Sequence, residues 1–150
     1  MKDKTIDYVL RTTWLAVTKM YNEEATQFES TMATGFALLS IDPETGTPST
    51  ALGPRMGMEA TSLSRTLKTM EEKGLIVRRP NPEDGRGVLI FLTDFGREKR
   101  EYSRERVLTF NTTIRDNISD EKMNHFYEVA ELINNMISNK KIYNQKETRK

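Results

Sequence analysis

The sequence contains no cysteine and a single histidine, His125, among its 150 residues. The lack of cysteine excludes disulfides, zinc-thiolate centres and thiol-based redox sensing. One histidine cannot form a multi-histidine metal site, and no loop has the aspartate spacing of a calcium site. We therefore expect no metal and no cofactor, and an ordinary surface or interface position for His125.

Long hydrophobic runs are also missing. No apolar stretch approaches the roughly 20 residues that a membrane-spanning helix needs, and the first residues, MKDKTIDY, lack the apolar segment of a signal peptide. The content of 36% hydrophobic and 30% charged residues is that of a soluble protein, and the length fits one domain. We expect a cytoplasmic protein with no membrane partner.

The sequence shows no catalytic apparatus. No nucleophile stands beside a base, and no glycine-rich loop of the phosphate-binding type is present. Three acidic residues near the N-terminus have no paired partner and are more simply solvated helix surface: Glu23, Glu24 and Glu29. We expect a protein that is not an enzyme and has no catalytic residue.

Charge is distributed unevenly along the chain. The formal net charge is +1, but residues 55–100 hold ten basic and seven acidic side chains, a local charge of +3. A basic local field inside a nearly neutral protein permits a nucleic-acid-binding face without requiring one.

The hydrophobic periodicity predicts a mainly α protein with a small β-hairpin, an α+β fold. Helices are expected at 6–28, 31–41, 49–57, within 58–74, at 94–117 and at about 120–137, with a turn at 42–48 and strands at 75–79 and 88–92. Between the strands, RRPNPEDGRG at 78–87 reads as a stiff, charged loop. Pro54 lacks a backbone donor, so we expect the helix before Gly57 to be short, kinked or partly 3₁₀.

The helix within 58–74 has two unlike faces. One is apolar and carries Leu63, Leu67 and Met70, whereas the opposite face is small, hydroxylated and basic and carries Thr61, Ser64, Arg65 and Lys68. Small side chains let a helix enter the major groove, hydroxyls bond to phosphates or bases, and an arginine can bind guanine with two hydrogen bonds. Taken alone, such a face is more typical of solvated surface.

A hairpin with a basic loop follows this helix directly, which is the order of a winged helix-turn-helix. In that arrangement an arginine of the wing, such as Arg86, contacts the minor groove or the phosphates that line it.

Residues 63–96 resemble the multiple antibiotic resistance regulator (MarR) family of bacterial transcription factors. The matching pieces are LKTMEEKGLIVRRP, the pattern Asp84-x-Arg86, and Leu92-Thr93-x-x-Gly96. The resemblance implies a single domain over 1–150, with a winged lobe at about 31–93, a helical dimerisation region at about 5–30 and 94–139, and a basic, flexible tail at 140–150. It also implies a homodimer that binds double-stranded DNA at an inverted repeat.

The resemblance assigns roles to particular residues. Its DNA-binding positions correspond to Thr61, Ser62, Ser64, Arg65, Lys68 and Arg86. Asp84 corresponds to a residue that shapes the wing by pairing with a basic side chain, here Arg79 or Arg86. Gly85 stands where many relatives carry a second basic residue, which predicts a weaker wing contact.

The function implied is a sequence-specific repressor, released or retuned by a small effector whose identity the sequence does not reveal. Five residues could line an effector cavity, although their helical spacing is more often that of a plain core: Trp14, Met20, Tyr21, Met32 and Phe36. The basic tail could contact DNA phosphates or simply be solvated: Lys140, Lys141, Lys146, Arg149 and Lys150. The alternative hypothesis is a winged helix that binds proteins and not DNA, which Glu59, Glu71 and Glu72 make conceivable.

Overall fold

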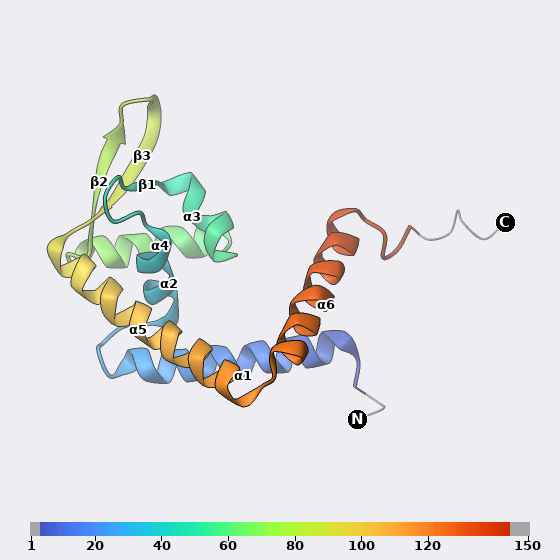
Figure 1. Cartoon of the computed structure of the whole chain (residues 1–150). Helices are drawn as coiled ribbons and strands as arrows, with labels where there is room; N and C mark the ends of the chain where they lie inside the picture. Colours follow the sequence, from blue (N-terminus) through green and yellow to red (C-terminus); the bar gives the residue numbers. More distant parts are fainter. Residues whose placement is uncertain (1–3, 145–150) are drawn as a thin grey trace. The chain divides into compact units, whose positions relative to one another are not determined.

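The computed structural model describes residues 4–144 (Figure 1). Its elements are α1 (Ile6–Thr26), α2 (Met32–Ser40), β1 (Thr47–Pro48), α3 (Ser49–Met56), α4 (Ala60–Glu72), β2 (Ile76–Asn81), β3 (Asp84–Leu92), α5 (Asp94–Asn117) and α6 (Asp120–Ser138). The chain divides into two compact units, one up to Glu105 and one from Arg106. The prediction of a mainly α fold with a small antiparallel sheet is confirmed.

The sheet has one strand more than the predicted hairpin. Its order is β1-β3-β2, with Thr47 opposite Ile90 and Pro48 opposite Leu89. Residues 42–48 were expected to be only a turn. A two-residue strand has no alternation to detect, and Pro48 is typical of a turn, so this pairing arises from the free edge of β3 and not from local propensity.

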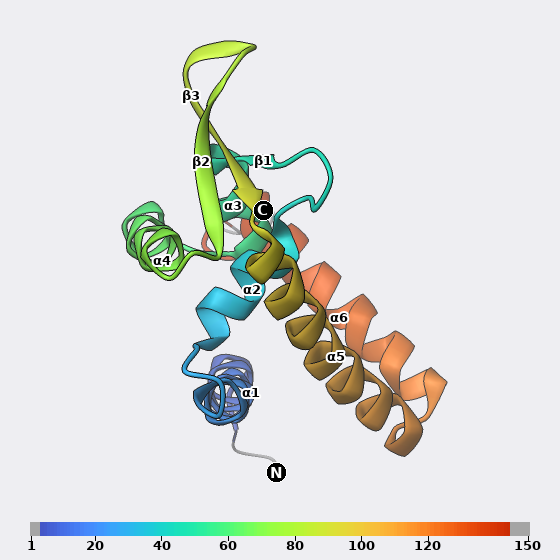
Figure 2. The same ribbon diagram turned by 90° about the vertical axis from the view of Figure 1, so that its left-hand side faces the viewer.

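The wing formed by β2 and β3 differs from the expected loop. Its strands run to Asn81 and from Asp84, so the turn consists of Pro82 and Glu83 alone. Pro80 lies opposite Val88 but Asn81 lies opposite Asp84, which leaves residues 85–87 as a bulge on β3. The glycines of this stretch therefore serve a bulge, and Pro80 is tolerated because β2 is an edge strand. Figure 2 shows the tip of the resulting hairpin projecting away from α2 and α4.

Pro54 does not break its helix. The eight residues of α3 remain α-helical, with Pro54 inside and Gly57 ending the helix in the left-handed region at φ 62°. The bond that Pro54 cannot donate would have gone to the carbonyl of Thr50, which is exposed and can bind water. The helix is short, as expected, but has no 3₁₀ turn.

The core of the first unit is shared by helices and sheet. Six large apolar side chains are almost completely buried: Leu38, Ile41, Leu52, Met70, Ile76 and Ile90. Each contributes about 1.5–3 kcal/mol relative to an exposed position. These residues come from α2, from Ile41 directly after it, and from α3, α4, β2 and β3. The core therefore packs α4 and the base of the wing against the same helices α2 and α3.

Thr93 joins the end of α4, both wing strands and the start of α5. Its hydroxyl donates to the carbonyl of Gly74 at 2.6 Å and accepts the backbone N–H of Gly96 at 3.0 Å. Its own N–H donates to the carbonyl of Leu75 at 3.1 Å. A side chain on Gly96 would collide with that carbonyl of Leu75. These contacts give a physical reason for the pattern Leu92-Thr93-x-x-Gly96.

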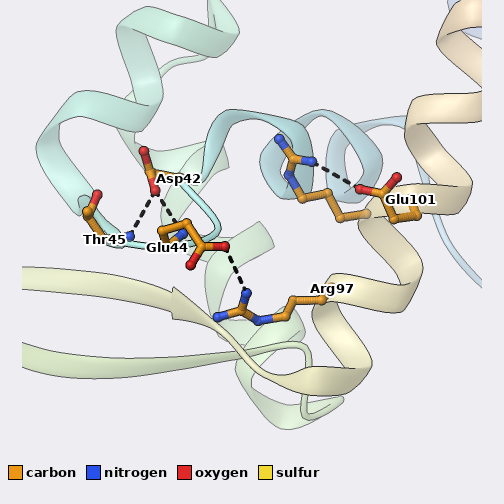
Figure 3. A network of polar contacts seen from close by, with 6 residues as sticks. Asp42, Glu44, Thr45, Arg97 and Glu101 are labelled. Atoms are coloured by element: carbon orange, nitrogen blue, oxygen red, sulfur yellow. Dashed lines mark hydrogen bonds and ion pairs between the residues drawn. The ribbon is translucent and has the colours of Figure 1, made fainter.

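A second polar network holds the turn between α2 and β1 (Figure 3). The Asp42 carboxylate accepts the backbone N–H groups of Glu44 and Thr45, both at 2.8 Å. Glu44 also forms an ion pair with Arg97 of α5 at 3.5 Å. The hydrogen bonds from Thr45 and Glu44 lower the pKa of Asp42 below its ordinary value.

Replacing Thr93 with Val should lower the free energy of unfolding by about 1–3 kcal/mol, because two hydrogen bonds of the hydroxyl are lost. Thr93→Ser is the matched control, since it keeps the hydroxyl. Urea unfolding followed by circular dichroism measures both variants. Equal stability of the Val and Ser variants would contradict the role given to the hydroxyl.

Acid unfolding should depend on Asp42. Its folded pKa is lowered, so its contribution to stability is present above the unfolded pKa and is lost as pH falls through the folded pKa. Asp42→Asn should therefore be less stable than the wild type near neutral pH, and the difference should shrink as pH falls below about 4. Urea midpoints measured from pH 7 to pH 2 test this, and a difference independent of pH would rule it out.

Candidate nucleic-acid interface

Helix α4 presents the sequence-predicted residues on one side. Its apolar residues Leu63, Leu67 and Met70 are buried. The five candidates on this helix are all exposed: Thr61, Ser62, Ser64, Arg65 and Lys68. The packing of the apolar side thus leaves a hydroxylated and basic surface that faces solvent.

The polar groups on this surface differ in their availability. The hydroxyls of Thr66 and Thr69 donate to carbonyls one turn earlier in the helix, each at 3.1 Å. Within residues 4–144, Arg65 and Lys68 form no ion pair, and the side chain of Ser64 forms no hydrogen bond. These three side chains can bind an external ligand without breaking an existing contact.

The C-terminal end of α4 is fixed by a left-handed glycine. Gly74 has φ 72°, and the N–H groups of Gly74 and Leu75 donate to the carbonyls of Glu71 and Met70. This arrangement ends the helix and directs the chain into β2. At the other end, Glu59 occupies the N-cap without a side-chain cap bond. The start of α4 is therefore open to other hydrogen-bond acceptors.

The three arginines of the wing have unlike surroundings. Arg78 forms an ion pair with Glu71 of α4, with Nε 3.4 Å from Oε2. The guanidinium of Arg79 lies over the ring of Phe91, 5.1 Å from its centroid. Arg86 is exposed and has no ion-pair partner among the described residues. The sequence singled out Glu71 only as a possible protein contact, because its pairing with Arg78 depends on how β2 packs beside α4.

Asp84 shapes the wing through the backbone. Its Oδ1 accepts the N–H of Arg86 at 3.1 Å, whereas no guanidinium within residues 4–144 lies at ion-pair distance from it. The expected pairing with the side chain of Arg79 or Arg86 is therefore replaced by a backbone contact. Asn81 acts in the same way, because its Oδ1 accepts the N–H of Glu83 at 3.0 Å. Asn81 was not singled out within the predicted loop, although asparagine beside proline is a turn signal.

The remaining candidate residues lie in ordinary core or surface positions. Trp14 is 56% exposed, and the rings of Tyr21 and Phe36 meet edge to face at 5.6 Å, as in an ordinary core; Met20 and Met32 are partly buried. Burial raises the pKa of Tyr21. His125, Lys140 and Lys141 are exposed, while Lys146, Arg149 and Lys150 lie outside the described residues.

Between residues 4 and 144, no three histidine, aspartate or glutamate side chains gather closely enough to hold a metal ion. Over the same range, no helix has the length and hydrophobicity needed to cross a membrane.

Comparison with known proteins agrees with this geometry. Residues 31–88 match the model of the MarR family. An uncharacterized HTH-type transcriptional regulator of Bacillus subtilis, YdgJ, is 34% identical over 88 residues, which are 59% of this chain and 54% of that protein. The chain therefore spans about half the length of this curated relative.

Solved structures share the fold. The S. aureus MepR–DNA complex has a TM-score of 0.78 at 20% identity, covering 89% of this chain and 99% of that one. The PcaV regulator of Streptomyces coelicolor, solved with its natural ligand, has a TM-score of 0.76 at 19% identity, covering 88% and 93%. Residues 31–88 are thus similar to the MarR family, and the described residues share the fold of these solved structures.

Proposed function

We propose that the protein is a homodimeric, sequence-specific DNA-binding regulator that represses transcription until a small effector binds. The observation that carries this proposal is the exposed face of α4, whose arginine, lysine and hydroxyl groups have no competing ion pairs among the described residues. The curated relative is named an HTH-type transcriptional regulator, a class that is not enzymatic. The structurally similar MepR was solved with DNA.

In this function α4 enters the major groove. Arg65 donates two hydrogen bonds to a guanine, Ser64 and Thr61 contact bases or phosphates, and Lys68 binds a phosphate. The ion pair between Arg78 and Glu71 ties the wing to this helix. In this arrangement α4 recognises bases, and the wing contacts the DNA backbone.

The dimer is proposed from the helices at the two ends of the chain. Neither α1 nor α6 contains a buried residue. Their large exposed side chains include Ile6, Val9, Leu10, Trp14 and Leu15 on α1, and Phe126, Tyr127, Val129, Leu132 and Ile137 on α6. Apolar surface of this extent typically marks an interface. We assign residues 5–30 and 94–139 to dimerisation and about 31–93 to the DNA-binding lobe, so that the two lobes of a twofold dimer contact half-sites about 34 Å apart.

The effector is proposed to act by shifting a population of conformations in the cytoplasm, where the DNA lies. A ligand that prefers a lobe spacing unable to span two half-sites lowers DNA affinity by its differential binding. Two buried polar atoms, Thr18 Oγ1 and Arg100 Nε, have no hydrogen-bond partner among the described residues. Buried groups of this kind normally find a partner. Arg100 Nη1 already pairs with Glu101 at 3.3 Å, so it is the Nε–H that is left to donate to an effector.

Replacing Arg65 with Ala should weaken binding to the preferred DNA site about tenfold to a hundredfold and relax the preference for one base pair. Arg104→Ala is the matched control, because it removes the same charge from α5. Fluorescence anisotropy on a site selected from random DNA measures both. A wild-type protein that selects no sequence would overturn the DNA-binding function and favour a winged helix that binds proteins.

Trp14, the single tryptophan, should report dimerisation. Its side chain is 56% exposed within one chain and becomes buried in the proposed dimer, so its emission should shift to longer wavelength on dilution below the dimer dissociation constant. Leu132→Glu should give a monomer by sedimentation and retain its helical content. A wild type that sediments as a monomer at high concentration would contradict the proposed dimer.

A further inference from the structure

We propose that Lys73 is a positioning residue for DNA binding: its ammonium ties the C-terminal end of α4 to the corner between α1 and α2 and does not contact DNA. The proposal rests on the DNA-binding function above and adds a residue that sets the orientation of α4. Lys73 is the C-cap of α4, and its Nζ donates to the backbone carbonyl of Glu29 at 2.9 Å. The two residues are 44 positions apart in the sequence, so the contact is a tertiary link.

The ammonium of Lys73 lies where α1 lacks a cation of its own. The C-terminal end of a helix carries partial negative charge and is stabilised by a basic side chain close to it. The last turn of α1 contains no basic residue. The backbone of Lys73 belongs to the end of α4, whereas its charge reaches the turn that follows α1. One side chain therefore joins the C-terminal ends of two helices.

Glu29 has a backbone conformation that needs support. Its φ is 53°, in the left-handed region that glycine adopts readily and that strains other residues. The N–H groups of Glu29 and Ser30 donate to the carbonyls of Thr26 and Ala25, at 3.1 Å and 3.0 Å. These bonds end α1, and neither uses the carbonyl of Glu29, which accepts the Lys73 ammonium instead. The ammonium thus helps to hold the strained turn.

The corner between α1 and α2 is a firm anchor for this link. Asn22 Oδ1 accepts the backbone N–H of Met32 at 3.0 Å, and Asn22 Nδ2 donates to the carbonyl of Thr18 at 3.1 Å. The first bond crosses from α1 to the first residue of α2, and the second fixes the amide on α1. The ring of Phe28 also packs on Tyr102 of α5, with the ring centroids 4.0 Å apart. The carbonyl that accepts the ammonium therefore belongs to a corner held by α1, α2 and α5.

The link acts at one end of α4, and the residues proposed to read DNA extend toward the other. The carbonyl of Gly74 is held by Thr93, so the ammonium of Lys73 and the hydroxyl of Thr93 fix the same end of α4 from two different elements. Thr61 lies about 18 Å from Lys73 along the helix, at about 1.5 Å per residue. A rotation of about 10° at the C-terminal end moves Thr61 by about 3 Å, which is enough to break a hydrogen bond with a base.

The first experiment separates positioning from DNA contact. Lys73→Met removes the ammonium and keeps a long side chain of high helix propensity. It should weaken binding to the selected site about fivefold and leave the dependence of affinity on salt unchanged. Lys68→Met is the matched comparison on the same helix, because loss of its phosphate contact should lower the salt slope by about one. A salt slope lowered by about one in Lys73→Met would show that this ammonium contacts a phosphate and would overturn the proposal.

The second experiment separates positioning from stability alone. Affinity is measured on the selected site and on unrelated DNA, at a temperature where circular dichroism shows every variant to be folded. Lys73→Met should lose about fivefold on the selected site and less than about twofold on unrelated DNA, because a displaced α4 still meets phosphates. Lys73→Arg keeps the cation and the donor and should restore the wild-type ratio of the two affinities. A ratio unchanged in Lys73→Met would indicate a purely structural role and contradict the proposal.

The third experiment tests the link itself. Hydrogen exchange at the amides of Glu29 and Ser30 should be faster in Lys73→Met than in the wild type and should return to the wild-type rate in Lys73→Arg. Glu29→Gln keeps the carbonyl that accepts the ammonium, so its DNA affinity should stay within about twofold of the wild type. Equal exchange in Lys73→Met and the wild type, or a loss of affinity in Glu29→Gln as large as in Lys73→Met, would rule out the link through the carbonyl.

Failure of this proposal can be distinguished from failure of the DNA-binding function. If Arg65→Ala weakens binding to the selected site and Lys73→Met does not, the function stands and the positioning role is wrong. If the wild type selects no DNA sequence at all, the function fails and the positioning role fails with it.

Discussion

The structure depends on the hydrogen-bonded junction at Thr93. One hydroxyl bonds to the carbonyl that ends α4 and to an N–H that begins α5, while the backbone of Thr93 bonds to Leu75 at the start of the wing. Gly96 permits this approach because a side chain there would meet the Leu75 carbonyl. The junction ties the helix proposed to read DNA, the wing and the first turns of α5 together at one point.

The core determines which side of α4 is available. Leu63, Leu67 and Met70 pack with the same residues that hold β2 and β3, so rotation of the helix would expose apolar surface. This constraint keeps Arg65 and Lys68 on the solvent side whether or not DNA is present. The ion pair between Glu71 and Arg78 adds a link from α4 to the wing. A prepared surface of this kind loses little conformational freedom on binding.

The wing shows how a charged segment acquires different roles from its surroundings. Three arginines fall within nine residues of sequence, yet one pairs with a carboxylate, one lies on an aromatic ring and one remains exposed. The bulge separates Arg86 from the acidic turn, which makes the apex and the flank of the same hairpin opposite in charge. The formal net charge of the chain, +1, contains none of this information.

The sequence by itself determined the order of the helices, the two faces of α4, the glycine that ends it and the family resemblance, because these depend on contacts within a few residues. Thr93 and Ser119 begin their helices as local capping rules predict. Only the tertiary structure decided the strand β1, the bulge at 85–87, the backbone partner of Asp84 and the separate partners of Arg78 and Arg79. Each of these depends on a strand register or on a neighbour that folding brings into contact, so local propensity has no means of specifying it.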